Sequence, residues 1–260
     1  TSPPMDPKPS STSPPLDRAS SSAAKKPAKT MMMICGTDGS GTRSAVKLLQ
    51  SLGVKMSVDD AGTMDIHAER ANLKGWPSIV KKILPYAREG GGTDYRPSDL
   101  PPAVYSEAID WVERLLDAYE PKSPTAGDSP GTEITWGFKA PVSMHLVPVF
   151  AEVLAKRGQG LRVLHVVRDG RDISFSGNQS PVRKFWSLVH PSQPVEQVGA
   201  EAAALTFWDD NNVGTYKFGM RHAALPSELS RALHIEDPVQ LTGDKERMRE
   251  LDGFWMGFMV

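Results

Sequence analysis

A glycine-rich turn near residue 40 has the residue types of a phosphate-binding loop. An apolar run, residues 31–35, precedes the turn, and an apolar periodicity typical of a helix follows it. Glycines let a backbone turn sharply and bring its N–H groups against an anion, and the start of the next helix adds the positive end of a helix dipole. The residues that we predict to bind a phosphate-containing ligand are Gly36, Thr37, Asp38, Gly39, Ser40, Gly41, Thr42 and Arg43.

The turn departs from the Walker A pattern of P-loop NTPases at an informative position. That pattern places a lysine, and then Ser or Thr, directly after its last glycine. Here Thr42 takes the place of the lysine and Arg43 follows it. The sequence therefore predicts a loop that holds a phosphate without the lysine that P-loop NTPases place on the β- and γ-phosphates.

A second candidate phosphate contact follows the clearest predicted strand, residues 161–167. Arg168 comes directly after this strand, and Ser176 lies eight residues further on, which is about two turns of a helix. Arginine offers a planar fork of donors that matches phosphate oxygens, and a serine hydroxyl adds a neutral donor. We predict that both side chains bind one phosphate; the alternative is that Arg168 and its acidic neighbours only form a charged surface at a helix start.

Alternating strand-like and helix-like segments position these two motifs. Buried strands are predicted at residues 31–35, 54–58, 134–139 and 161–167, with an edge strand at 233–235. Helices are predicted at residues 45–52, 75–87, 104–119, 143–157 and 197–217, and another from about residue 169. Since strands separated by helices form a parallel sheet covered on both faces, we predict a three-layer α/β fold with ligands beyond the carboxyl ends of the strands.

Composition limits the class of protein. The 260 residues, 39% of them hydrophobic and 23% charged, suffice for one sizeable domain. Residues 1–29, rich in Pro, Ser and Lys, are predicted to be a disordered leader, which leaves a domain at 30–260. A net charge of −1 gives no basic field for nucleic acid, and no apolar stretch approaches the about 20 residues of a membrane span. Because the chain begins with Thr, we expect a fragment or a processed form, and its compartment, cytoplasm or Golgi lumen, is left open.

Together the two phosphate motifs resemble those of the sulfotransferases that use 3′-phosphoadenosine 5′-phosphosulfate (PAPS). In that family a loop ending Ser-Gly-Thr holds the 5′-phosphosulfate, and a strand-end Arg with a Ser at the same spacing binds the 3′-phosphate. Residues 40–42, with Arg168 and Ser176, fit this scheme. The string at 41–43 is most similar to the carbohydrate (heparan-type) branch. Weaker likenesses at residues 136–141 and 233–238 extend the resemblance over about residues 31–252.

The resemblance implies a P-loop-like domain that transfers a sulfuryl group from PAPS to a hydroxyl or amine, with a carbohydrate as the favoured acceptor. PAPS is then the co-substrate, and no metal is required because fixed donors hold the leaving phosphate. The reaction needs a cation at the bridging oxygen and a base for the acceptor hydroxyl. Lys139, at a strand end, is the first choice for the cation and Arg43 the second. Asp65, His67 and Glu69 follow the second predicted strand, and each is a candidate base.

Three departures from the family keep other classes of protein open. Gly39 stands where members usually have Lys or Arg, residues 139–141 lack the histidine of the cytosolic branch, and no Arg-Lys-Gly segment precedes Val260. Either other residues take these roles, the chain is truncated at its C-terminus, or it binds without turnover. The alternatives are a degenerate P-loop nucleotide kinase or NTPase, against which Thr42 argues, and a non-catalytic nucleotide-binding protein.

Overall fold

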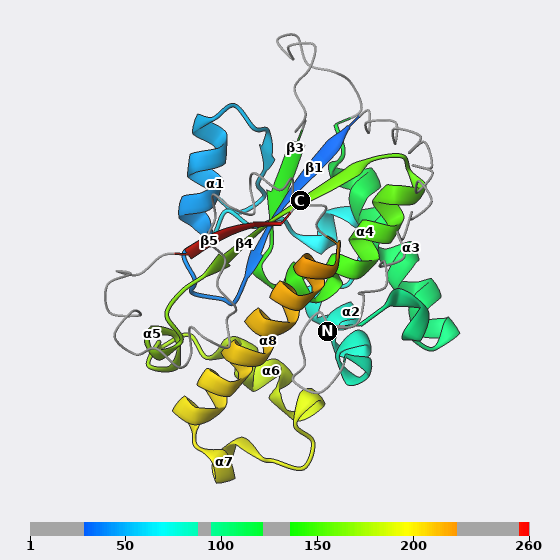
Figure 1. The fold of residues 1–260 in the computed structure, drawn as a ribbon. Helices are drawn as coiled ribbons and strands as arrows, with labels where there is room; N and C mark the ends of the chain where they lie inside the picture. Colours follow the sequence, from blue (N-terminus) through cyan, green and yellow to red (C-terminus); the bar gives the residue numbers. More distant parts are fainter. Residues whose placement is uncertain (1–28, 88–94, 122–135, 223–254, 260) are drawn as a thin grey trace, which may run out of the picture.

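Four parallel strands form the centre of the molecule in the order β2-β3-β1-β4, and a fifth, β5, pairs antiparallel with β4. The computed structural model describes residues 29–87, 95–121, 136–222 and 255–259. The strands are β1 (Thr30–Gly36), β2 (Met56–Ser57), β3 (Trp136–Lys139), β4 (Gly160–Val167) and β5 (Trp255–Met259). The strand that precedes the glycine-rich turn therefore lies inside the sheet, between β3 and β4 (Figure 1).

The central strand β1 is buried on both of its faces. Its alternate residues Met31, Met33 and Cys35 belong to one hydrophobic core, and Met32 and Ile34 belong to another. A continuous apolar run is typical of a parallel strand covered by helices on both sides. Burial also raises the pKa of the Cys35 thiol, as expected for an inert core cysteine.

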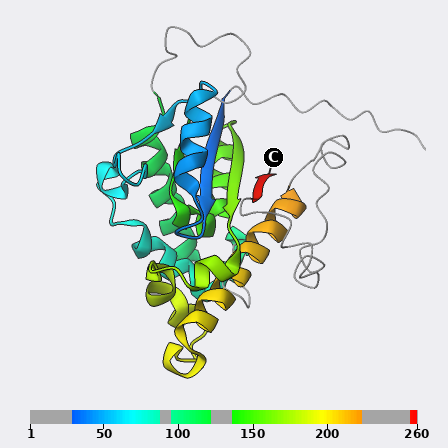
Figure 2. The ribbon, with the colours of Figure 1, turned by 90° about the vertical axis from the view of Figure 1, so that its left-hand side faces the viewer.

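Helices cover both faces of the sheet, and the predicted three-layer, P-loop-like α/β fold is confirmed. In Figure 1 helix α1 lies on one side of the strands, and α3 and α4 lie on the other; Figure 2 shows the same layers from the side of α1. The helices that flank the sheet are α1 (Thr42–Ser51), α2 (Trp76–Ile83), α3 (Pro102–Tyr119) and α4 (Val147–Lys156). Those near the carboxyl ends of the strands are α5 (Gly170–Ser174), α6 (Ser180–Val189), α7 (Val195–Val198) and α8 (Ala200–His222).

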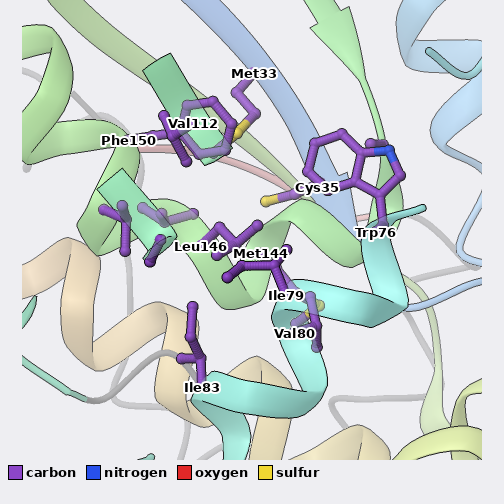
Figure 3. Packing of buried hydrophobic residues seen from close by; sticks show 14 of the residues in the cluster. Met33, Cys35, Trp76, Ile79, Val80, Ile83, Val112, Met144, Leu146 and Phe150 are labelled. Carbon is purple, nitrogen blue, oxygen red and sulfur yellow. The ribbon is translucent and has the colours of Figure 1, made fainter. Parts of the chain in front are cut away.

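An aromatic cluster in the larger core holds the end of β3 in place. The ring centroids of Trp76 and Trp111 lie 4.9 Å apart, and those of Phe138 and Phe150 lie 5.7 Å apart. Figure 3 shows Trp76 and Phe150 among the aliphatic and sulfur side chains of this core. Aromatic pairs at such distances add about 0.5–1.5 kcal/mol beyond their burial. Because Phe138 precedes Lys139 in β3, this packing fixes where the lysine leaves the sheet.

Most predicted elements are present, with different ends. The α-helix predicted at 75–87 stops at Ile83 and continues as a 3-10 turn, Leu84–Tyr86, because proline at 85 lacks an N–H donor. The helix predicted at 143–157 begins as a 3-10 turn, Pro141–Leu146. Gly199, with φ of +89°, separates α7 from α8 within the helix predicted at 197–217. Residues 1–28 of the leader predicted at 1–29, and the strand predicted at 233–235, lie outside the described residues.

Candidate functional site

The two predicted phosphate motifs meet at the carboxyl edge of the sheet. Strands β1 and β4 are parallel neighbours, and their register pairs Gly36 with Val166. The glycine-rich loop and Arg168 therefore leave the sheet side by side, although 129 residues separate Arg168 from Gly39. The guanidinium Nη1 of Arg168 donates a hydrogen bond to the Gly39 carbonyl over 3.3 Å.

Two glycines allow the loop to pass close to β4 and to turn. A Cβ atom on Gly36 would lie 2.4 Å from the carbonyl oxygen of Val166, so no larger residue fits there without a shift of the backbone. Gly39 has φ of +89°, a left-handed conformation that favours glycine. The loop turns tightly between them, because the Ser40 N–H bonds to the Thr37 carbonyl over 3.1 Å.

Helix α1 begins directly after this loop, and no described side chain caps its N-terminus. Gly41 is the N-cap of α1, and no side chain bonds to the first N–H groups of the helix among the described residues. Such groups, with the helix dipole, attract anions. The hydroxyls of Thr37 and Ser40 are buried and, in the described part of the chain, have no hydrogen-bond partner. Because buried polar groups are normally paired, these hydroxyls are candidate ligand contacts.

Ser176 reaches the loop by a path that differs from the predicted one. The helix after β4 ends at Ser174, so a turn rather than two helical turns brings Ser176 back. The side-chain amide of Gln179 holds this turn by donating to the carbonyls of Ile173, Ser174 and Ser176, at 2.8, 3.0 and 2.9 Å. The Ser176 hydroxyl lies 4.0 Å from the Cβ position of Gly39, in the same place as Arg168. Gln179 is a positioning residue that the sequence analysis missed.

The two predicted cations both hold the segment at residues 59–65. The Lys139 ammonium lies 2.8 Å from an Asp65 carboxylate oxygen and donates to the Thr63 carbonyl over 2.6 Å. Its side chain is only 4% exposed, so these partners compensate most of its charge. Arg43 donates to the Gly62 carbonyl over 3.1 Å from an exposed position.

The three predicted bases are not in one place. Asp65 is paired with Lys139. His67 is exposed, and its main-chain N–H bonds to the carboxylate of Asp59 over 2.8 Å. Glu69 belongs to a 3-10 turn (Ala68–Ala71) that follows His67. One of its carboxylate oxygens lies 3.0 Å from the Cβ position of Gly75. Only Asp65 of these three contacts Lys139 among the described residues.

Asp38 is the loop residue with the most unusual electrostatic environment. Burial raises the pKa of the Asp38 carboxyl, and the nearby charge of Asp65 raises it further. The positive charges of Lys184 on α6 and of Lys139 act in the opposite direction. The sequence analysis placed Asp38 among the ligand contacts but missed Lys184, since no local pattern indicates that α6 approaches the loop.

No protein-family model, curated protein or solved structure matches the chain. Function therefore has to be inferred from the groups at this edge of the sheet. Within the described ranges, none of the helices has the length and apolar character needed to cross a membrane. The same part of the chain contains no group of three or more His, Cys, Asp or Glu side chains arranged to hold a metal ion.

Proposed function

We propose that this protein is a sulfotransferase that moves a sulfuryl group from PAPS to a hydroxyl or amine acceptor. The observation that carries the proposal is the contact of Arg168 with the Gly39 carbonyl, because it joins the two phosphate-binding motifs in one site. A mononucleotide with phosphates on both its 5′ and 3′ positions needs two such motifs at a fixed separation. Ser176, beside Gly39, completes the second motif.

The 5′-phosphosulfate is assigned to the loop and the 3′-phosphate to Arg168 and Ser176. At the loop, the free N–H groups at the start of α1 and the Ser40 and Thr42 side chains are the donors. Arg168 uses two of its nitrogens on Gly39 and Asp172. A guanidinium has five N–H donors, so it can donate to a phosphate as well. Ser176 adds a neutral donor.

Sulfuryl transfer at such a site depends on positioning and electrostatics. The acceptor oxygen attacks sulfur in line with the bond to the bridging oxygen, and negative charge develops on the 5′-phosphate of the leaving nucleotide. The α1 dipole and the N–H groups of the loop stabilise that charge. Lys139, which lies at the end of β3, contributes a fixed positive charge, and its bond to Asp65 keeps it in position.

The acceptor is assigned as a carbohydrate on the string Gly41-Thr42-Arg43, which is similar to the heparan-type branch of the PAPS-dependent family. Phenols, steroids and amines are the competing acceptors. A panel of these compounds with radiolabelled PAPS distinguishes them, and the proposal expects the highest kcat/KM for a glycan.

A protein that binds the nucleotide without turnover is the second candidate. Lys139 is almost fully buried against Asp65 and the Thr63 carbonyl, and Gly39 brings no cation of its own. Both facts reduce the positive charge that is free to act on the sulfuryl group. Binding of PAPS without transfer to any acceptor of the panel would favour this candidate.

Calorimetric titration tests the class of ligand. The protein is titrated with the desulfonated nucleotide adenosine 3′,5′-bisphosphate (PAP) and, separately, with ATP and Mg²⁺ at the same ionic strength. The proposal expects PAP to bind at least about tenfold more tightly, a difference of about 1.4 kcal/mol. Tighter binding of ATP would replace the sulfotransferase with a degenerate P-loop nucleotide kinase or NTPase.

A further inference from the structure

Asp38 is an acidic residue in a loop that we propose to bind an anion. It is the sole acidic residue among positions 36–43, and its negative charge opposes a phosphate held by the same loop. Among the described residues no hydrogen bond reaches its carboxylate, and the positive charges near it are those of Lys184 and Lys139. Burial of a carboxylate that has no hydrogen-bond partner costs folding free energy.

Asp38 is one of the residues that line a small cavity. The cavity measures about 10 Å³ and is lined by the loop, by α5, by the turn before α6, by the start of α6 and by α8. Asn178 and Gln179 of that turn and Trp208 of α8 line it together with Thr37 and Asp38. Such a space holds about one water-sized group. A hydroxyl group has that size.

The charged groups around Asp38 come from three directions. Asp65 approaches from the segment after β2, Lys139 from β3 and Lys184 from α6. On the side of α8 the cavity wall is made by uncharged residues. Burial first and Asp65 second raise the pKa of Asp38, which makes its carboxylate a stronger base than an exposed one.

The other candidate bases are less well placed for this role. Asp65 is committed to Lys139 at 2.8 Å. His67 and Glu69 are exposed, and Glu69 lies against Gly75. Asp38, in contrast, adjoins Gly39, whose carbonyl receives Arg168. Of these carboxyl and imidazole groups, Asp38 alone belongs to the loop that would carry the phosphosulfate.

We infer that Asp38 is the general base of the reaction, an inference that rests on the proposed function. Its carboxylate takes the proton of the acceptor hydroxyl while the acceptor oxygen forms a bond to sulfur. The bond between sulfur and the bridging oxygen breaks, and its electron pair leaves on the 5′-phosphate of PAP. Lys184 is a positioning residue in this scheme, because its charge sets the pH at which Asp38 loses its proton.

Asp38→Asn, Asp38→Glu and a matched control, Asp110→Asn, test this role. Asp110 is an exposed aspartate of α3 that pairs with Arg114. Asp38→Asn should lower kcat by about 100-fold or more and leave PAP affinity unchanged or higher, because a negative charge leaves the anion site. Asp38→Glu should restore part of the rate, and Asp110→Asn should match the wild type. Retained transfer in Asp38→Asn, or weaker PAP binding, would overturn the inference.

The pH profile gives a second readout that a purely structural residue would not move. Lys184→Gln removes a positive charge that lowers the pKa of Asp38, so the acid limb of kcat/KM should shift to higher pH. Arg183→Gln, one residue away on α6, removes the same charge and should leave the limb in place. An unchanged limb in Lys184→Gln contradicts the inference. Failure of the proposed function is distinct, because the wild type itself would then neither bind PAP nor transfer sulfate.

Discussion

Removal of the Arg168 guanidinium should weaken the binding of the 3′-phosphate of the proposed nucleotide and have little effect on the binding of its 5′-phosphate. In Arg168→Ala the Gly39 carbonyl loses its hydrogen bond from the guanidinium, and the assigned 3′-phosphate loses its cation. Hydrogen bonds to charged groups contribute about 1.5–3 kcal/mol. Because the side chain is 36% exposed, solvent screening favours the lower part of that range. A loss of about 2 kcal/mol corresponds to about 30-fold weaker PAP binding.

The assay is calorimetric titration of PAP and of adenosine 5′-phosphosulfate, which has no 3′-phosphate. Arg168→Ala should weaken PAP by about 30-fold and the second ligand by about threefold or less. Arg171→Ala is the matched control, because Arg171 carries the same charge on the same segment but pairs with Asp169 at 2.5 Å and is 58% exposed. Its effect should stay within about twofold.

Equal losses for the two ligands would refute the assignment of the 3′-phosphate to Arg168. An equal effect of Arg171→Ala would show that the contribution is a general one of positive charge on the surface. Thermal unfolding of each variant checks that the fold is retained. Asp172, which loses its partner in Arg168→Ala, is 56% exposed, so its release should cost little stability.

Three further predictions concern stability. Gly36→Ala should lower the free energy of unfolding by about 1–3 kcal/mol in urea, because its Cβ would lie 2.4 Å from a β4 carbonyl. Lys139→Met should cost about 3–5 kcal/mol, nearer the lower figure since Asp65 is 27% exposed, and should slow transfer strongly. Burial lowers the pKa of His145 and of His165 from 6.5 to about 4, so protonation favours the unfolded chain and stability falls between pH 6.5 and 4. The loss at pH 5, measured by urea unfolding, should be about 2 kcal/mol for each histidine.

Each of these predictions has a control and a contradicting result. Gly53→Ala places a Cβ in open space, so it isolates backbone strain from the clash at Gly36; equal costs for the two would contradict the close approach to β4. Wild-type transfer by Lys139→Met would remove Lys139 from the reaction. A variant that lacks both buried histidines should show a shallower loss of stability below pH 6.5, and an unchanged slope would contradict the assignment.

Local sequence patterns were sufficient for the elements that build the phosphate loop. The apolar run before Gly36 is buried along its whole length, and residues 163–166 of the strand before Arg168 are buried as well. Such strands show in a sequence as continuous hydrophobic runs. Their place in a parallel sheet follows from the alternation of strands and helices. These features rest on residues close to one another in the chain, so a single sequence contains the necessary information.

The polar contacts of the site were less accessible to prediction. The pair of Lys139 with Asp65 and the approach of Lys184 to Asp38 depend on how distant segments pack, which no local pattern specifies. The path to Ser176 was predicted as helix, but α5 ends early and Gln179 bonds to the freed carbonyls. Contacts between side chains of distant segments at the carboxyl edge of the sheet are visible only in the folded structure.

A crystal structure of the protein with PAP tests the central claim most directly. The account predicts the 5′-phosphate at the start of α1, against the loop at residues 36–43, and the 3′-phosphate between Arg168 and Ser176. A nucleotide bound elsewhere, or bound with its 3′-phosphate away from Arg168, would contradict it.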